Sequence, residues 1–155
     1  MFESLGDASG DGPVAIRTWV GEAVILPCRI NVSRRQDVPS VEWSKRGLTP
    51  NVCFLYRAGC ETFEEKNPVF LFRTGLFLEE LKNGNASLRL SDVRLTDAGI
   101  YECRRLQGAP RVVSIVELFV GTSENTHTFF LKSLRRWVSI HNDRPSCSFV
   151  TIKRI

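Results

Sequence analysis

The sequence predicts an all-β fold in which two sheets pack face to face, and three observations support this. Tyr101 and Cys103 follow the turn-forming segment 97–99 and stand two residues apart, so alternation along a strand turns both to the same buried side. An earlier cysteine, Cys28, ends an apolar run, and Trp43 follows it by fifteen residues. Residues of these types in this order predict a disulfide between Cys28 and Cys103 that joins the two sheets across a buried indole.

The spacing favours an immunoglobulin-like V-set β-sandwich, with antiparallel sheets and Greek-key connections. Variable-type sandwiches carry an extra strand pair in the middle of the chain, and the interval from Trp43 to Arg73 has room for it. Leu88 alternates with polar neighbours and is expected in the core beside Trp43 and Tyr101. The expected strands, apart from the one that holds Tyr101 and Cys103, are 14–16, 23–28, 41–44, 52–56, a short neighbour after the turn at 57–59, 70–74, 86–90 and 111–120.

The chain divides into three expected segments. Residues 1–12 are polar and glycine-rich and are expected to form a flexible lead-in, and residues 13–120 form the sandwich. From 121 to 155 the alternating pattern ends, so we expect an irregular tail that is disordered or a non-native terminus, such as a translated intron. A basic segment that binds anionic surfaces is the alternative interpretation of this tail.

The charge distribution argues against nucleic acid as a partner of the sandwich. The chain has 21 basic and 17 acidic residues, but residues 1–120 contain 15 of each and are neutral. The tail supplies the whole excess, with six basic residues and two acidic ones. Five cysteines, two of them at the spacing described above, indicate an oxidising compartment.

The cysteines predict an extracellular location, although neither a signal peptide nor a membrane-spanning segment is visible in the sequence. The chain begins with an acidic, glycine-rich segment that does not resemble a signal peptide. The longest apolar run, 112–120, is well short of the ~20 residues that span a membrane. We expect a fragment or an imperfect gene model of a protein on the external side of the plasma membrane, attached through segments missing from this chain. A secreted protein is the alternative.

Four segments of the predicted sandwich carry a more specific pattern. They are 55–57 (LYR), 72–74 (FRT), 84–90 (GNASLRL) and 93–103 (VRLTDAGIYEC). These segments resemble the V-set domain of butyrophilins, myelin oligodendrocyte glycoprotein and the related T-cell costimulatory ligands, and the resemblance covers residues 14–120. It implies that Arg73 pairs with Asp97 and locks one end of the sandwich, a contact strengthened by charge. The last strand lacks the Phe-Gly-x-Gly bulge of antigen-receptor variable domains, which argues against that identity.

Two kinds of covalent site are expected besides the main disulfide. Asn31 and Asn85 each begin an Asn-x-Ser triplet and are candidate glycosylation sites. Cys53 and Cys60 are candidates for a second disulfide, although a hairpin turning at 58–59 places Cys60 opposite Arg57 and keeps the two thiols apart. An irregular loop could still join them, so the pairing of Cys53, Cys60 and Cys147 stays open.

Alternation also predicts a binding face on one sheet and the adjoining loop. The V-set relatives use the outer side of this sheet for recognition, and an ordinary solvated surface is the competing interpretation. The candidate partner-binding residues are Glu42, Ser44, Glu102, Arg104, Arg105 and Gln107.

No enzymatic function is expected. The only histidines, His127 and His141, lie in the tail, and no nucleophile has a base at a recognisable spacing. A zinc site built from His141, Cys147 and the spare cysteines would lack a close Cys or His pair. We therefore expect no cofactor and no metal.

The resemblance implies a recognition role. The leading hypothesis is an extracellular domain of a butyrophilin-like protein that binds a receptor on lymphocytes and regulates T-cell receptor signalling and cytokine output. An adhesion molecule or an innate receptor that signals in its own cell is the alternative with the same fold, and the sheet face could also form a homodimer. A soluble basic factor that binds anionic surfaces through the tail is the alternative of another class.

Overall fold

The computed structural model describes residues 12–32 and 38–122. The predicted lead-in up to residue 11 and the predicted tail from residue 123 onward lie outside the described residues. The elements, in chain order, are β1 (Val14–Trp19), β2 (Val24–Leu26), β3 (Val41–Lys45), β4 (Val52–Arg57), β5 (Cys60–Thr62), η1 (Pro68–Phe70), β6 (Thr74–Leu76), α1 (Leu78–Leu81), β7 (Leu88–Leu90), η2 (Leu95–Asp97), β8 (Gly99–Arg105) and β9 (Arg111–Gly121).

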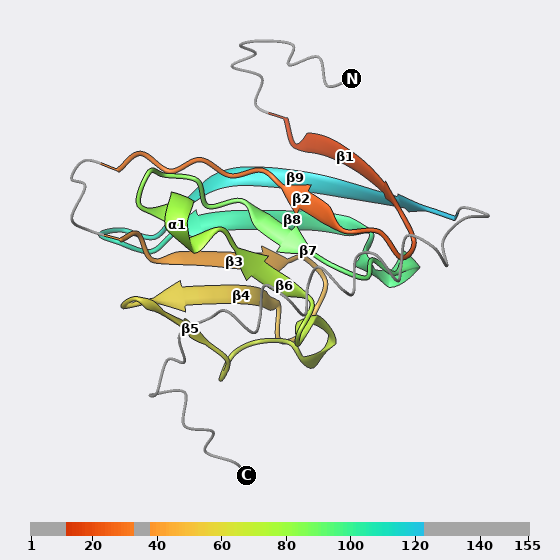
Figure 1. The fold of residues 1–155 in the computed structure, drawn as a ribbon, viewed down its shortest axis with the longest axis horizontal. Coiled ribbons are helices and arrows are strands. Elements are labelled where there is room, and N and C mark those ends of the chain that lie inside the picture. The colour runs from red at the N-terminus through yellow and green to blue at the C-terminus, as the bar shows by residue number, and fades with distance from the viewer. Residues whose placement is uncertain (1–11, 33–37, 123–155) are drawn as a thin grey trace.

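The strands form two sheets that pack face to face (Figure 1). One sheet has six strands in the order β1-β9-β8-β3-β4-β5, and the other has three in the order β2-β7-β6. Neighbouring strands run antiparallel except β1 and β9, which run parallel with Val14 opposite Val116. The predicted fold class is confirmed, and β4 and β5 are the extra strand pair of the variable type.

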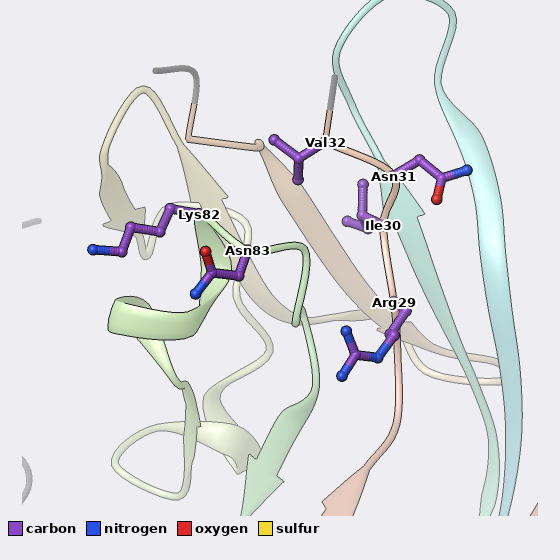
Figure 2. A pocket seen from close by; sticks show the side chains of 6 residues that line it. All are labelled: Arg29, Ile30, Asn31, Val32, Lys82 and Asn83. Atoms are coloured by element: carbon purple, nitrogen blue, oxygen red, sulfur yellow. The ribbon is translucent and has the colours of Figure 1, made fainter. Parts of the chain in front are cut away.

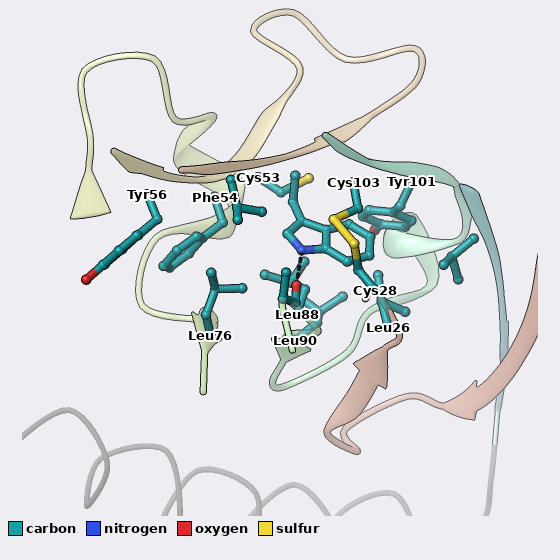
Figure 3. Close-up of a cluster of buried hydrophobic side chains, with 14 of the residues drawn as sticks. Leu26, Cys28, Cys53, Phe54, Tyr56, Leu76, Leu88, Leu90, Tyr101 and Cys103 are labelled. Carbon is teal, nitrogen blue, oxygen red and sulfur yellow. Dashed lines mark hydrogen bonds between the residues drawn. A yellow bond between two sulfur atoms is a disulfide. The ribbon is translucent and has the colours of Figure 1, made fainter. Parts of the chain in front are cut away.

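A buried indole and one disulfide hold the two sheets together. The Trp43 ring is fully buried, and its Nε1 donates a hydrogen bond to the backbone oxygen of Ala86 at 2.8 Å (Figure 3). Cys28, just after β2, is bonded to Cys103 on β8, which is the predicted pairing. Leucines from both β2 and β7 close the core around the indole; the buried ones are Leu26, Leu88 and Leu90.

The end of the sandwich near η2 is closed by the corner that precedes β8. The Tyr101 side chain is buried, and its hydroxyl donates to the backbone oxygen of Asp97 at 2.6 Å. The Asp97 carboxylate in turn is bound by the guanidinium of Arg73, which the family resemblance implied. A tyrosine and an ion pair therefore fix the same turn from two sides.

The strand predicted at 70–74 is displaced, since β6 begins only at Thr74. Phe72 has a φ of 64°, and its side chain is exposed. This turn directs Arg73 into the interior, where its Nε donates to the backbone oxygen of Val69 at 2.9 Å. The hydrogen bonds of a buried guanidinium, rather than strand alternation, therefore set the path of the chain here.

Candidate binding face

The candidate binding face lies on the central strands of the six-stranded sheet, β3 and β8. Their antiparallel register sets Glu42 opposite Arg104 and Ser44 opposite Glu102, while Trp43 opposite Cys103 belongs to the core side. The structure therefore brings four of the predicted face residues together. They differ greatly in how much of each side chain a partner could reach.

Glu102 is the centre of a charged cluster on this face. Its Oε1 accepts hydrogen bonds from Arg46, with Nη2 at 2.6 Å and Nε at 3.0 Å, and its Oε2 accepts from Arg104 Nη2 at 3.0 Å. The hydrogen bonds from Arg46, and then those from Arg104, outweigh burial and hold the pKa of Glu102 below its usual range. Only 13% of the Glu102 side chain is exposed, against 52% for Arg46 and 39% for Arg104. A partner would therefore meet the two guanidiniums rather than the carboxylate.

Arg46 was missed as a site residue because the predicted strand ended at 44. In the register of β3 and β8, residue 42 is opposite residue 104 and residue 44 is opposite residue 102, so the same register places residue 46 opposite residue 100. The backbone N of Arg46 indeed donates to the backbone oxygen of Ile100 at 2.9 Å. Residue 46 is therefore a diagonal neighbour of Glu102 in the sheet. Extending the register by one pair would have found it.

The expectation that Ser44 contacts a partner is wrong. Only 2% of this residue is exposed. Ser44 lies in a central strand between Glu102 on β8 and Val52 on β4. The Ser44 side chain is shorter than those of Glu102 and Val52, so we attribute its burial to these larger neighbours.

The remaining predicted residues lie toward the end of the sandwich. Glu42 and Arg105 are half-buried, and Arg105 pairs with Val41 on one side and Arg111 on the other. Gln107 is exposed, and its Nε2 donates to the backbone oxygen of Val38 at 3.1 Å, which ties the β8–β9 loop to the segment before β3. Arg46, just after β3, is thus exposed, whereas Arg104 is half-buried like Glu42 and Arg105.

The two predicted glycosylation sites differ in their surroundings. Asn31 is exposed, and its triplet continues into residue 33, outside the described residues. Asn85 is half-buried: its Nδ2 donates to Glu80, and its Oδ1 accepts from the backbone N of Ser87 at 3.1 Å. The Ser87 hydroxyl is itself buried and accepts from the backbone N of Cys28. Asn31 is therefore the more accessible acceptor.

The structure does not form the second disulfide that was left open. Cys53 is a free thiol, fully buried in β4, and Cys60 lies opposite Arg57, in the register that the turn at 58–59 predicts. Burial raises the pKa of the Cys53 thiol far above its usual range. The hairpin geometry keeps the two side chains apart. Cys147 lies outside the described residues.

The enzyme and metal hypotheses concern residues of the tail. His127 and His141 both lie outside the described residues. Within the described ranges, no three side chains of His, Cys, Asp or Glu are grouped so that they could hold a metal ion. Over the same part of the chain, no helix is both long enough and apolar enough to cross a membrane.

Comparison with known proteins identifies the family. The sequence model of the immunoglobulin V-set domain matches residues 11–120. The chain belongs to this V-set family. Human V-set domain-containing T-cell activation inhibitor 1 is 34% identical over 84 residues, which are 54% of this chain and 29% of that protein. Human butyrophilin subfamily 1 member A1 is 31% identical over 91 residues, 59% of this chain and 17% of that protein.

A solved structure supports the same assignment. The human B7-H4 IgV-like domain superposes with a TM-score of 0.63 at 30% identity, covering 71% of this chain and 95% of that one. The resemblance to butyrophilins, myelin oligodendrocyte glycoprotein and T-cell ligands is confirmed. The V-set domain aligns with less than a third of the length of the two curated relatives described above.

Proposed function

We propose that this V-set domain is the extracellular recognition domain of a butyrophilin-like cell-surface protein. In this proposal it binds a protein receptor on lymphocytes and thereby regulates T-cell receptor signalling and cytokine production. The similarity to a protein named as a T-cell activation inhibitor supports an immune-regulatory role. The disulfide between Cys28 and Cys103 supports an oxidising, extracellular setting.

The observation that carries the proposal is the pair of exposed guanidiniums on the sheet face. Arg46 and Arg104 are held in place by hydrogen bonds to one carboxylate, that of Glu102, on adjacent strands of the sheet. Arginine is enriched among the residues that dominate binding energy, and a preorganised side chain loses less entropy on binding. Recognition by this face would need no chemical step, so we propose a binding function rather than catalysis.

The test is binding of the full 155-residue chain, displayed as a multivalent fusion, to activated T cells. We expect binding together with a change in cytokine release under receptor stimulation. Arg46→Ala with Arg104→Ala should reduce binding at least tenfold. The matched control is Arg94→Ala with Arg17→Ala, which also removes two exposed positive charges but leaves β3 and β8 intact.

Three results would contradict the proposal. Absence of binding to lymphocytes would refute the receptor class, and equal losses in both double variants would show a non-specific charge effect. Self-association that disappears in Arg46→Ala/Arg104→Ala, without any lymphocyte binding, would assign the face to a homodimer instead. Circular dichroism and an intact disulfide establish that each variant is folded.

A further inference from the structure

A second feature of the surface lies away from the sheet face, where the segment after β2 meets the turn after α1. A pocket of about 330 Å³ opens there and is lined by Arg29, Ile30, Asn31, Val32, Lys82 and Asn83 (Figure 2). The volume is at the lower end of the range for small-molecule sites. None of the predicted sheet-face residues lines it.

The lining carries positive charge without a compensating acid. Two of the six lining residues, Arg29 and Lys82, are cations, two are amides, and none is a carboxylate. Within residues 12–32 and 38–122, neither cation takes part in an ion pair. The nearby acid Glu80 is already bound by the amide of Asn85. The pocket therefore offers donors and positive charge to an anion.

Backbone contacts join the two segments beneath the pocket and fix the points from which the lining side chains project. Arg29 directly follows the disulfide-bonded Cys28 and pairs with Asn85 in a β-bridge. Ile30 donates its backbone N to the oxygen of Gly84 at 2.8 Å. A side chain at residue 84 would collide with the backbone there, because a Cβ would lie 2.3 Å from the Ile30 oxygen.

The directions of the side chains indicate which groups would contact the ligand. The guanidinium of Arg29 extends toward the gap between the two segments, whereas the amide of Asn83 lies on the far side of its own segment and points away from Arg29 (Figure 2). Lys82 and Asn31 point outward on opposite sides of the pocket, so Lys82 would act mainly through its electric field. Val32 adds an apolar wall that could contact the carbon face of a ring.

We infer that this pocket binds the oxyanion of an acidic saccharide, a sugar carboxylate or a sugar sulfate. The guanidinium of Arg29 can bind the two oxygens of such a group through parallel hydrogen bonds, and Lys82 adds a second positive charge to the lining. The small, open shape fits one sugar ring rather than an extended ligand. Asn31, a candidate glycosylation site, lies on the rim, so the saccharide could belong to this chain or to another molecule.

The experiment is a titration of the full chain with 3′-sialyllactose and with sulfated lactose, followed by NMR or calorimetry, and with neutral lactose as the reference. We expect the acidic sugars to bind at least tenfold more tightly than lactose. Arg29→Gln should weaken that binding at least tenfold, and Lys82→Gln by less than threefold. The control Arg111→Gln removes an exposed cation outside the pocket and should leave the affinity unchanged.

Equal affinity for acidic and neutral sugars, or an equal loss in Arg29→Gln and Arg111→Gln, would overturn the inference. Arg29→Lys keeps the charge but cannot form two parallel hydrogen bonds to one oxyanion, and it provides a second test if Arg29→Gln fails to fold. The source of the saccharide follows from Asn31→Gln combined with Asn85→Gln. Tighter binding of added sugar to this glycan-free chain means that its own glycan occupies the pocket, and unchanged binding assigns the ligand to another molecule.

Discussion

Arg73 and Asp97 are joined by two parallel hydrogen bonds, with Nη1 at 2.7 Å from Oδ2 and Nη2 at 2.9 Å from Oδ1. Both side chains are more than nine-tenths buried. The same guanidinium donates to the backbone oxygen of Asp92, and the carboxylate accepts from the backbone N of Arg94. The pair thus connects the turn before β6 to the turn before β8, and almost every polar atom of both side chains has a partner.

Asp97→Asn should destabilise the domain strongly. The change keeps the shape of the side chain but leaves the Arg73 charge buried without a counter-charge, a loss of about 3–5 kcal/mol in the free energy of unfolding. The matched control is Asp92→Asn, whose partner Arg94 is 53% exposed at 3.8 Å and whose loss should cost about 1 kcal/mol or less. Urea unfolding at pH 7 with the disulfide intact measures both. Similar midpoints for the two variants would refute a structural role for the pair.

The fold was predictable because its frame depends on local regularities. Cys28, Trp43 and Tyr101 lie on strands where alternation with a period of two decides which side chain is buried, and alternation can be seen in a sequence. The pairing across the turn at 58–59 was predictable for the same reason, since the position of the turn determines which residues are opposite each other.

What was not predictable depends on neighbours distant in sequence. Ser44 lies between residues of two other strands, and the turn at Phe72 precedes Arg73, whose side chain binds a carboxylate 24 residues away. The pocket likewise joins the segment after β2 to the turn after α1. Period-two patterns carry no information about such contacts, so the sequence predicted which residues share the outer side of β3 and β8 but not that Ser44 is buried there.

The Glu102 cluster should make stability depend on pH in the acidic range. Because the pKa of Glu102 in the folded state is held below its ordinary value of 4.5, first by the hydrogen bonds from Arg46, the ionised form stabilises the fold. This contribution is fully present above pH 4.5 and is lost as the pH falls through the lower pKa of the folded state. Thermal unfolding of the wild type and Glu102→Gln at a series of pH values measures it. We expect the difference between the two to shrink toward low pH, and a constant difference would contradict the account.

The Cys53 thiol should not react with an alkylating reagent while the domain is folded. Its sulfur is fully buried and burial raises its pKa, so neither access nor the thiolate form is available. Incubation with iodoacetamide before and after unfolding, followed by peptide mapping without reductant, measures the labelling of this residue. We expect labelling only after unfolding. A peptide in which Cys53 is linked to Cys60 would show that the disulfide forms despite the hairpin register.

Two glycines with nearly the same φ offer a matched test of close packing at the pocket. Gly84 and Gly47 have φ values of 92° and 87°, so replacement by alanine costs each about 1 kcal/mol of conformational strain. Only Gly84 also has a neighbour in the way, the backbone oxygen of Ile30 at 2.3 Å from a Cβ, whereas nothing lies within 4 Å at Gly47. A backbone oxygen cannot swing aside as a flexible side chain would.

We therefore expect Gly84→Ala to lower the free energy of unfolding by about 3 kcal/mol and Gly47→Ala by about 1 kcal/mol, as measured by urea unfolding. The difference between the variants isolates the steric contact, because the backbone strain is common to both. Amide exchange at Ile30, whose backbone N donates to the Gly84 oxygen, should quicken in Gly84→Ala alone. Equal losses of stability in the two variants would mean that the segments are not held together at this point, and Arg29 would then lack the rigid base on which an anion site depends.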